Sequence, residues 1–241
     1  MKKTICMILL LALSFVFAVS ACFYISGYLQ DKEQLDELKS IAQTVDDNTQ
    51  NSNNKYAELY AQNSDFIGWI RIDGTGIDYP VVQSKDDPDF YLKHNFSKEY
   101  SRFGIPYMQE NCGLSSDNII IYGHNIKSKS MFNELTEYKD KDFYSAHKYI
   151  TFDTLNEQRT YEVVAAFKTV AYSDSGFQYY AFVNANTEED FNAYIAKCKA
   201  LSFYDTGVTA EYGDKLLTLS TCEYSQENGR FVVVAKLIEV K

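Results

Sequence analysis

The chain has 241 residues, enough for one large domain or two small ones. Its 33 acidic residues outnumber its 23 basic residues and give a formal net charge of −10, and an acidic surface repels phosphate backbones, so nucleic acid is not an expected partner. A hydrophobic content of 46% with only 3 Pro and 11 Gly excludes a disordered or collagen-like chain.

The N-terminal segment predicts export from the cytoplasm. Lys2 and Lys3 precede an apolar run from about Ile5 to Ile25, and no charged residue follows before Asp31. A helix of this length can span the bilayer, and the two lysines would stay on the cytoplasmic side. The apolar run also continues past position 22. We therefore expect an uncleaved anchor over residues 1–28, with a single pass through the cell membrane.

Two other interpretations of this segment stay open. Ala18, Ser20 and Ala21 are small residues of the kind that precede a signal-peptide cleavage site. The sequence Val19–Cys22 also resembles a bacterial lipoprotein processing site, with Cys22 as the lipidated residue. All three interpretations place the rest of the chain on the extracytoplasmic face of the membrane.

A polar stalk and linker are expected over residues 29–54. Leu35, Leu38, Ile41 and Val45 recur at helical spacing and predict an amphipathic helix from about residue 30. Asp46–Asn54 has the composition of a flexible linker. The main folded domain is then expected over residues 55–241.

This domain is predicted to be mainly β. Seven segments are rich in Val, Ile, Tyr or Phe, and most are bounded by turn residues. They are Phe66–Ile72, Ile77–Gln83, Asn118–Tyr122, Tyr149–Phe152, Tyr161–Val170, Lys215–Cys222 and Phe231–Val240. At least seven strands in one domain predict a closed or nearly closed β-barrel.

Helices are expected at the periphery of this barrel. The candidate segments are Lys55–Asn63, Ser130–Glu137, Asp140–Ala146 and Thr187–Leu201. The last has the strongest support, because acidic residues occupy its first turn and apolar residues recur on one face.

Cysteine usage points to a free thiol. Two of the five cysteines, Cys6 and Cys22, lie in the apolar segment, which leaves Cys112, Cys198 and Cys222 in the main domain. Three cysteines cannot all pair within one chain, so at least one is free or joined to another molecule. The sequence holds no C-x-x-C pair and no H-E-x-x-H stretch, so neither a metal nor another cofactor is expected.

Three residues could carry chemistry. Cys222 ends an apolar strand, and a thiol nucleophile needs a base or a cation nearby. His124 also follows an apolar strand, after Gly123, which could turn the chain and expose the ring. Arg230 opens the last strand, so a hairpin would bring its guanidinium near Cys222. Taken singly, each could instead be a structural cysteine, a packed histidine or a solvated arginine.

Together these residues resemble the sortase family of cysteine transpeptidases. The matching motifs are Tyr122-Gly123-His124, Thr218-Leu219-Ser220-Thr221-Cys222 and Asn228-Gly229-Arg230-Phe231-Val232-Val233, with His124, Cys222 and Arg230 separated by about 98 and about 8 residues. The resemblance extends from about Phe66 to the C-terminus. It is greatest to class B, because of the helical segments 55–63 and 187–201 and the sequence D-F-I-G-W-I-R-I-D-G-T.

The resemblance implies a fold and a reaction. The fold would be a closed sortase-type barrel of about seven to eight strands, with N-terminal helices and a long helix between the sixth and seventh strands. Cys222 would attack the Thr carbonyl of a C-terminal sorting signal on a secreted protein, and a peptidoglycan amine would resolve the acyl-enzyme. His124 would protonate the leaving amine, and Arg230 would hold the substrate backbone and stabilise the oxyanion.

Five further residues are candidates for the substrate groove, although packing or solvation would explain each of them equally well. They are Ser220, Tyr122, Glu223, Tyr179 and Tyr180. Two other function classes also stay open. One is an extracytoplasmic cysteine peptidase with water as the acceptor, and the other is a non-catalytic surface β-protein with an inert thiol.

Overall fold

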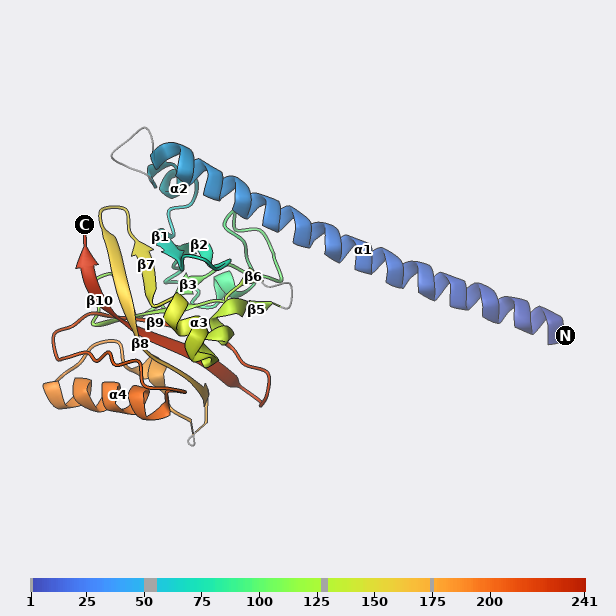
Figure 1. Ribbon diagram of the computed structural model, residues 1–241. Helices are drawn as coiled ribbons and strands as arrows, with labels where there is room; N and C mark the ends of the chain where they lie inside the picture. Colours follow the sequence, from blue (N-terminus) through green and yellow to red (C-terminus); the bar gives the residue numbers. More distant parts are fainter. Residues whose placement is uncertain (1, 50–55, 127–129, 174–175) are drawn as a thin grey trace. The chain divides into compact units, whose positions relative to one another are not determined.

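The computed structural model describes residues 2–49, 56–126, 130–173 and 176–241 (Figure 1). The chain divides into two compact units, residues 1–43 and residues 44–241. The predicted boundaries at residues 28 and 54 remain a prediction.

Helix α1 (Lys2–Thr49) begins the chain. Among the described residues it holds the one stretch that is long and apolar enough to cross a membrane, within Leu10–Ala42, with a mean hydropathy of 2.0. This property rests on length and composition, so it fits an anchor, a cleaved signal and a lipoprotein alike. The helix predicted from about residue 30 is confirmed.

The linker predicted over Asp46–Asn54 is wrong as far as Thr49, because α1 continues to that residue. No glycine or proline interrupts residues 46–49, so their polar composition alone does not end the helix. Residues 50–54 lie outside the described part of the chain.

Eight strands form a closed barrel. In chain order they are β1 (Phe66–Arg71), β2 (Asp78–Val82), β3 (Tyr107–Met108), β4 (Asn118–Tyr122), β7 (Tyr149–Asp153), β8 (Gln158–Val170), β9 (Leu216–Cys222) and β10 (Gly229–Val240). Around the barrel the order is β1-β2-β3-β4-β9-β10-β8-β7, and β7 pairs with β1 to close it. The predicted fold class is therefore confirmed, and each of the seven predicted segments forms a strand.

Aromatic side chains fill much of the core. Trp69, Phe152, Phe167 and Phe231 each expose 2% or less of their surface. Every residue of β9 before Cys222 is buried. A strand buried in this way provides a rigid base for the residue at its exposed end.

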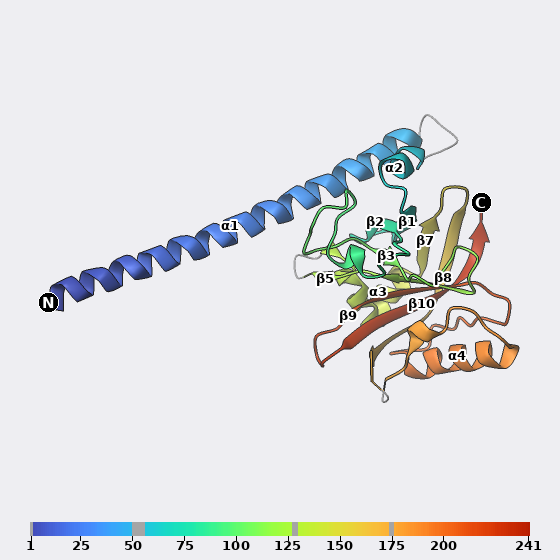
Figure 2. The ribbon, with the colours of Figure 1, turned by 180° about the vertical axis from the view of Figure 1, so that it is seen from behind.

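Strand pairing brings three chain segments to one edge of the barrel. β4 and β9 run parallel, with Tyr122 opposite Ser220. β9 and β10 run antiparallel and lie side by side in both views (Figures 1 and 2). The ends of β4 and β9 and the start of β10 therefore meet.

The helices lie outside the barrel. They are α2 (Ala57–Gln62), α3 (Lys141–Ala146), α4 (Glu188–Leu201) and the 3-10 helices η1 (Phe90–Leu92), η2 (Asn133–Lys139) and η3 (Tyr179–Ala181). α4 packs against β8 and lies between the sixth and seventh barrel strands in chain order, as predicted (Figure 1). The Thr187 side chain caps it by accepting from the N–H of Asp190 at 3.1 Å.

The helix predicted over Ser130–Glu137 is wrong in its first part. Ser130–Met131 forms β6, which pairs with β5 (Asn125–Ile126) in a separate two-stranded sheet. η2 follows only from Asn133. Pairing with the chain beyond β4 outweighs the local helical preference here.

Candidate active site

Cys222 and Arg230 face each other across two neighbouring strands. The register of β9 and β10 places them directly opposite one another, as the predicted hairpin requires. The N–H of Glu223 donates to the carbonyl of Gly229 at 2.9 Å and closes this end of the hairpin. Directly opposed residues project from the same face of a sheet, so the thiol and the guanidinium share one side of the barrel edge. Cys222 is a free, half-buried thiol.

His124 follows β4 and is held from both sides. Its carbonyl accepts from the N–H of Phe132 at 2.8 Å, and its Nε2 lies 2.8 Å from the carbonyl oxygen of Leu92. A carbonyl oxygen only accepts hydrogen bonds, so Nε2 carries a proton in this arrangement. Nδ1 is then the ring nitrogen that takes no part in this bond.

Gly123 was predicted to turn the chain, but in the structure its role is to allow close packing. A Cβ at this position would lie 2.6 Å from the ring of Phe132, and its φ is not in the left-handed region. Its N–H donates to the carbonyl of Ser220 at 3.1 Å and extends the pairing between β4 and β9 by one residue. Glycine is therefore needed to let His124 follow the strand past a buried ring.

One cavity of about 510 Å³ is lined by Cys222, His124 and Arg230 together. Four of the five candidate groove residues also line it: Ser220, Tyr122, Tyr179 and Tyr180. The structure thus brings together seven of the eight residues singled out in the sequence.

Polar contacts join several of the residues that line this cavity. The hydroxyl groups of Tyr179 and Ser220 are buried and lie 2.6 Å apart. Burial raises the pKa of Tyr179 to about 12, although the contacts with Ser220 and Arg230 oppose this rise, so its hydroxyl stays neutral near pH 7. The Tyr122 hydroxyl donates to the side-chain oxygen of Gln109.

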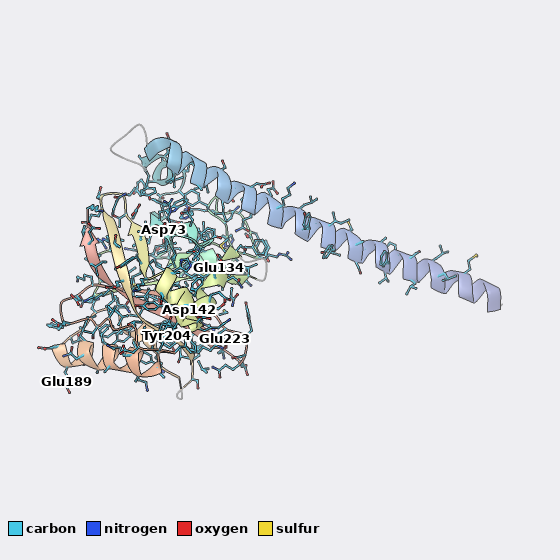
Figure 3. The ribbon with its side chains drawn as sticks, viewed as in Figure 1. Asp73, Glu134, Asp142, Glu189, Tyr204 and Glu223 are labelled. Atoms are coloured by element: carbon cyan, nitrogen blue, oxygen red, sulfur yellow. The ribbon has the colours of Figure 1, made fainter. Side chains whose placement is uncertain are left out.

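Glu223 is placed differently from the other candidates. It directly follows β9 and is labelled in Figure 3. It is not among the described residues that line the cavity. Its carboxylate pairs with Lys168 at 2.9 Å and accepts from Ser225. Although burial opposes the shift, the hydrogen bonds from Ser225 and Lys168 hold the pKa of Glu223 below its usual value. A role for Glu223 in substrate binding remains a prediction.

Arg230 is held at the rim of the cavity. Its guanidinium carbon lies 5.8 Å from the ring centre of Tyr172, within cation–π range, and Nη1 donates to the carbonyl of Gly229 at 3.0 Å. Tyr172 has a φ of 57° and is largely exposed. These two contacts hold the guanidinium beside the cavity.

Burial distinguishes Cys222 from the other two cysteines of the barrel unit. Cys112 and Cys198 are buried. Burial raises the pKa of Cys112 to about 11 and that of Cys198 to about 12, which keeps both thiols protonated and unreactive near pH 7. Cys222 is the thiol of this unit with access to the cavity.

Sequence reasoning missed part of the lining. Leu92, Tyr107, Gln109 and Tyr172 all contribute to it. Leu92 ends η1 in the connection between β2 and β3, Tyr107 belongs to β3, and Gln109 directly follows β3. β3 is only two residues long and gives no periodic signal. Asn125, which directly follows His124 but is not among the cavity-lining residues, was also missed, because nothing in the sequence marks the hydrogen bond that its side chain makes.

Comparison with known proteins identifies a family with the same domain. A family model described as a sortase domain matches residues 70–238. The chain is 38% identical to sortase B of Listeria monocytogenes over 213 residues, which cover 85% of this chain and 83% of that protein.

Two solved structures are similar over nearly their whole length. The Staphylococcus aureus sortase B–substrate complex has a TM-score of 0.79 and 30% identity, covering 88% of this chain and 99% of that chain. A sortase B complexed with triglycine also has a TM-score of 0.79 and 30% identity, covering 87% of this chain and 99% of that chain.

Proposed function

The chain belongs to the sortase family as a class B cysteine transpeptidase, and on this premise we propose that it joins secreted proteins to the cell wall. It cleaves a C-terminal sorting signal after Thr and transfers the acyl group to a peptidoglycan amine. Cys222, His124 and Arg230 carry the reaction.

The observation that carries this proposal is the convergence of the three side chains. Cys222 and Arg230 are opposed on adjacent strands, His124 follows the strand on the other side of β9, and all three line one cavity. A nucleophile, an acid or base and a fixed cation within one cavity are the parts that acyl transfer requires.

Acylation begins from the Cys222 thiolate and protonated His124. Sγ attacks the Thr carbonyl carbon, and the electron pair moves onto the carbonyl oxygen, where the Arg230 guanidinium stabilises the charge. The C–N bond then breaks, and the leaving amine takes a proton from His124. An acyl-thioester and a released C-terminal fragment result.

Transfer to the acceptor reverses these roles. An amine attacks the thioester carbonyl carbon and gives a proton to His124, and the C–S bond breaks to return the thiolate. The new amide joins the secreted protein to the acceptor. The bound substrate and the bound triglycine in the two similar sortase B structures support a peptide signal and an amine acceptor here.

Membrane attachment completes the proposal. The apolar stretch within Leu10–Ala42 supports an N-terminal anchor with the barrel on the extracytoplasmic face. An anchored enzyme would meet secreted proteins as they leave the membrane, which is also where lipid-linked wall precursors are found.

The test uses the full chain in detergent micelles with a panel of quenched sorting peptides, with and without triglycine. We expect native protein to cleave after Thr and to form ligated product when triglycine is present, and Cys222→Ala to be inactive. Cleavage that never yields ligated product with any amine would favour the peptidase interpretation. Cleavage that persists in Cys222→Ala would refute the proposed nucleophile.

A further inference from the structure

Asn125 links the segment that carries His124 to the segment that carries Cys222. Its side-chain Nδ2 donates to the carbonyl oxygen of Cys222 at 2.9 Å. Its own carbonyl oxygen accepts from the hydroxyl of Tyr224 at 3.0 Å. Asn125, which directly follows His124, is therefore hydrogen-bonded to both Cys222 and Tyr224.

A third contact fixes the orientation of this carboxamide. The Asn133 Nδ2 donates to the Asn125 Oδ1 at 2.6 Å. Because the Cys222 carbonyl oxygen only accepts hydrogen bonds, the donor end of Asn125 must face it, and Oδ1 is left to accept from Asn133. Asn133 begins η2, so this contact also ties the group to a second element of the barrel unit.

The contact lies where main-chain pairing between β4 and β9 stops. The last paired residues are Tyr122 and Ser220, and the N–H of Gly123 makes one further bond to the carbonyl of Ser220. Beyond Gly123, side-chain hydrogen bonds connect the two segments. The Thr221 hydroxyl donates to the carbonyl of Gly123 at 2.7 Å, and Asn125 bonds to Cys222.

We propose that Asn125 is a positioning residue, whose carboxamide sets the spacing between the His124 ring and the Cys222 thiol through a bond to the Cys222 carbonyl. The role rests on the proposed function of those two residues. Without this bond, two hydrogen bonds remain among the described residues beyond the strand pairing: the Thr221 hydroxyl to the Gly123 carbonyl and the Tyr224 hydroxyl to the Asn125 carbonyl. Proton exchange with a bound substrate depends on sub-ångström placement, so the loss falls on the chemical step.

Two substitutions separate positioning from packing. Asn125→Asp keeps the shape but replaces the donor with an oxygen that faces the Cys222 carbonyl, whereas Asn125→Ala removes the side chain. If Asn125 positions the site, Asn125→Asp should lower kcat more than Asn125→Ala. If Asn125 only fills space, Asn125→Ala should lower kcat more. Asn156→Asp, in the exposed turn between β7 and β8, is the matched control.

The experiment measures kcat, KM and Tm of the full chain in micelles, with a cleavable sorting peptide. For Asn125→Asp we expect kcat to fall about tenfold, which corresponds to about 1.4 kcal/mol, with KM within about twofold. Asn125→Ala should lower kcat less than Asn125→Asp does, and Asn156→Asp should have the kcat, KM and Tm of native protein. If Asn125→Asp does not fold, Asn133→Ala decides, since it removes the hydrogen bond that holds the Asn125 carboxamide and should lower kcat about threefold.

Native kcat in folded Asn125→Asp, or a greater loss in Asn125→Ala than in Asn125→Asp, would overturn the positioning role and leave the proposed function intact. Native kcat in Asn133→Ala would overturn it where Asn125→Asp cannot be measured. Native protein that cleaves no peptide would instead overturn the proposed function, and this role with it.

Discussion

Replacing Gly123 with alanine tests whether packing against Phe132 sets the position of His124. A Cβ at residue 123 would lie 2.6, 2.7 and 3.0 Å from three atoms of the Phe132 ring. That ring is fully buried and cannot swing into solvent. The Phe132 N–H also donates to the His124 carbonyl, so movement of either group disturbs the other.

The size of the effect follows from this geometry. Overpacking of a buried site costs about 1–3 kcal/mol. For a chain of this length, about 2 kcal/mol lowers Tm by roughly 4–8 °C. Because the displaced segment carries His124, we also expect kcat to fall about tenfold.

Thermal unfolding and peptide cleavage are the two assays. Gly113→Ala is the matched control, because a Cβ there meets no atom within 4 Å, and it should leave both values unchanged. Adding Phe132→Leu to Gly123→Ala should recover part of the lost Tm, since the smaller side chain makes room. Native Tm and kcat in Gly123→Ala would refute the packing explanation.

Two further predictions concern thiols and charge. Cys222 should react with a small alkylating reagent at least about tenfold faster than Cys112 or Cys198 at pH 8; peptide mapping reads each rate, and equal rates would contradict the assigned nucleophile. Lys168→Met should lower the free energy of unfolding by about 0.5–1 kcal/mol at pH 7, as expected for a partly exposed pair. Because the paired Glu223 has a lowered pKa, this difference should be present above about pH 4.3 and vanish as the pH falls through the lowered pKa. Urea titrations at neutral and acidic pH measure it, and a difference independent of pH would contradict the assignment.

Most of the barrel was visible in the sequence because its strands are long and apolar. The seven segments that were predicted have four or more residues, and each forms a strand. β3 was missed because two residues carry no period, and β6 because Ser130–Met131 begins a stretch with helical preference. Short strands are fixed by their partners, which local sequence does not contain.

The site was predicted unevenly for a similar reason. The opposition of Cys222 and Arg230 follows from a local hairpin, which sequence patterns can identify. The approach of His124 to Cys222 depends on the parallel pairing of β4 with β9, and only the family resemblance indicated it. Asn125 and Leu92 act through a side-chain bond and a carbonyl, and neither carries a sequence signature.

The parallel pairing of β4 and β9 also determines when catalytic competence arises during folding. The contact between Gly123 and Thr221 spans 98 residues, and closing so long a loop is slow relative to forming local turns. The hairpin of β9 and β10 can form early and place Arg230 beside Cys222 while His124 is still remote. A folding chain would therefore pass through a stage in which the Cys222 thiol is exposed while His124 has not yet reached it. During that interval it would be open to oxidation but unable to process a substrate.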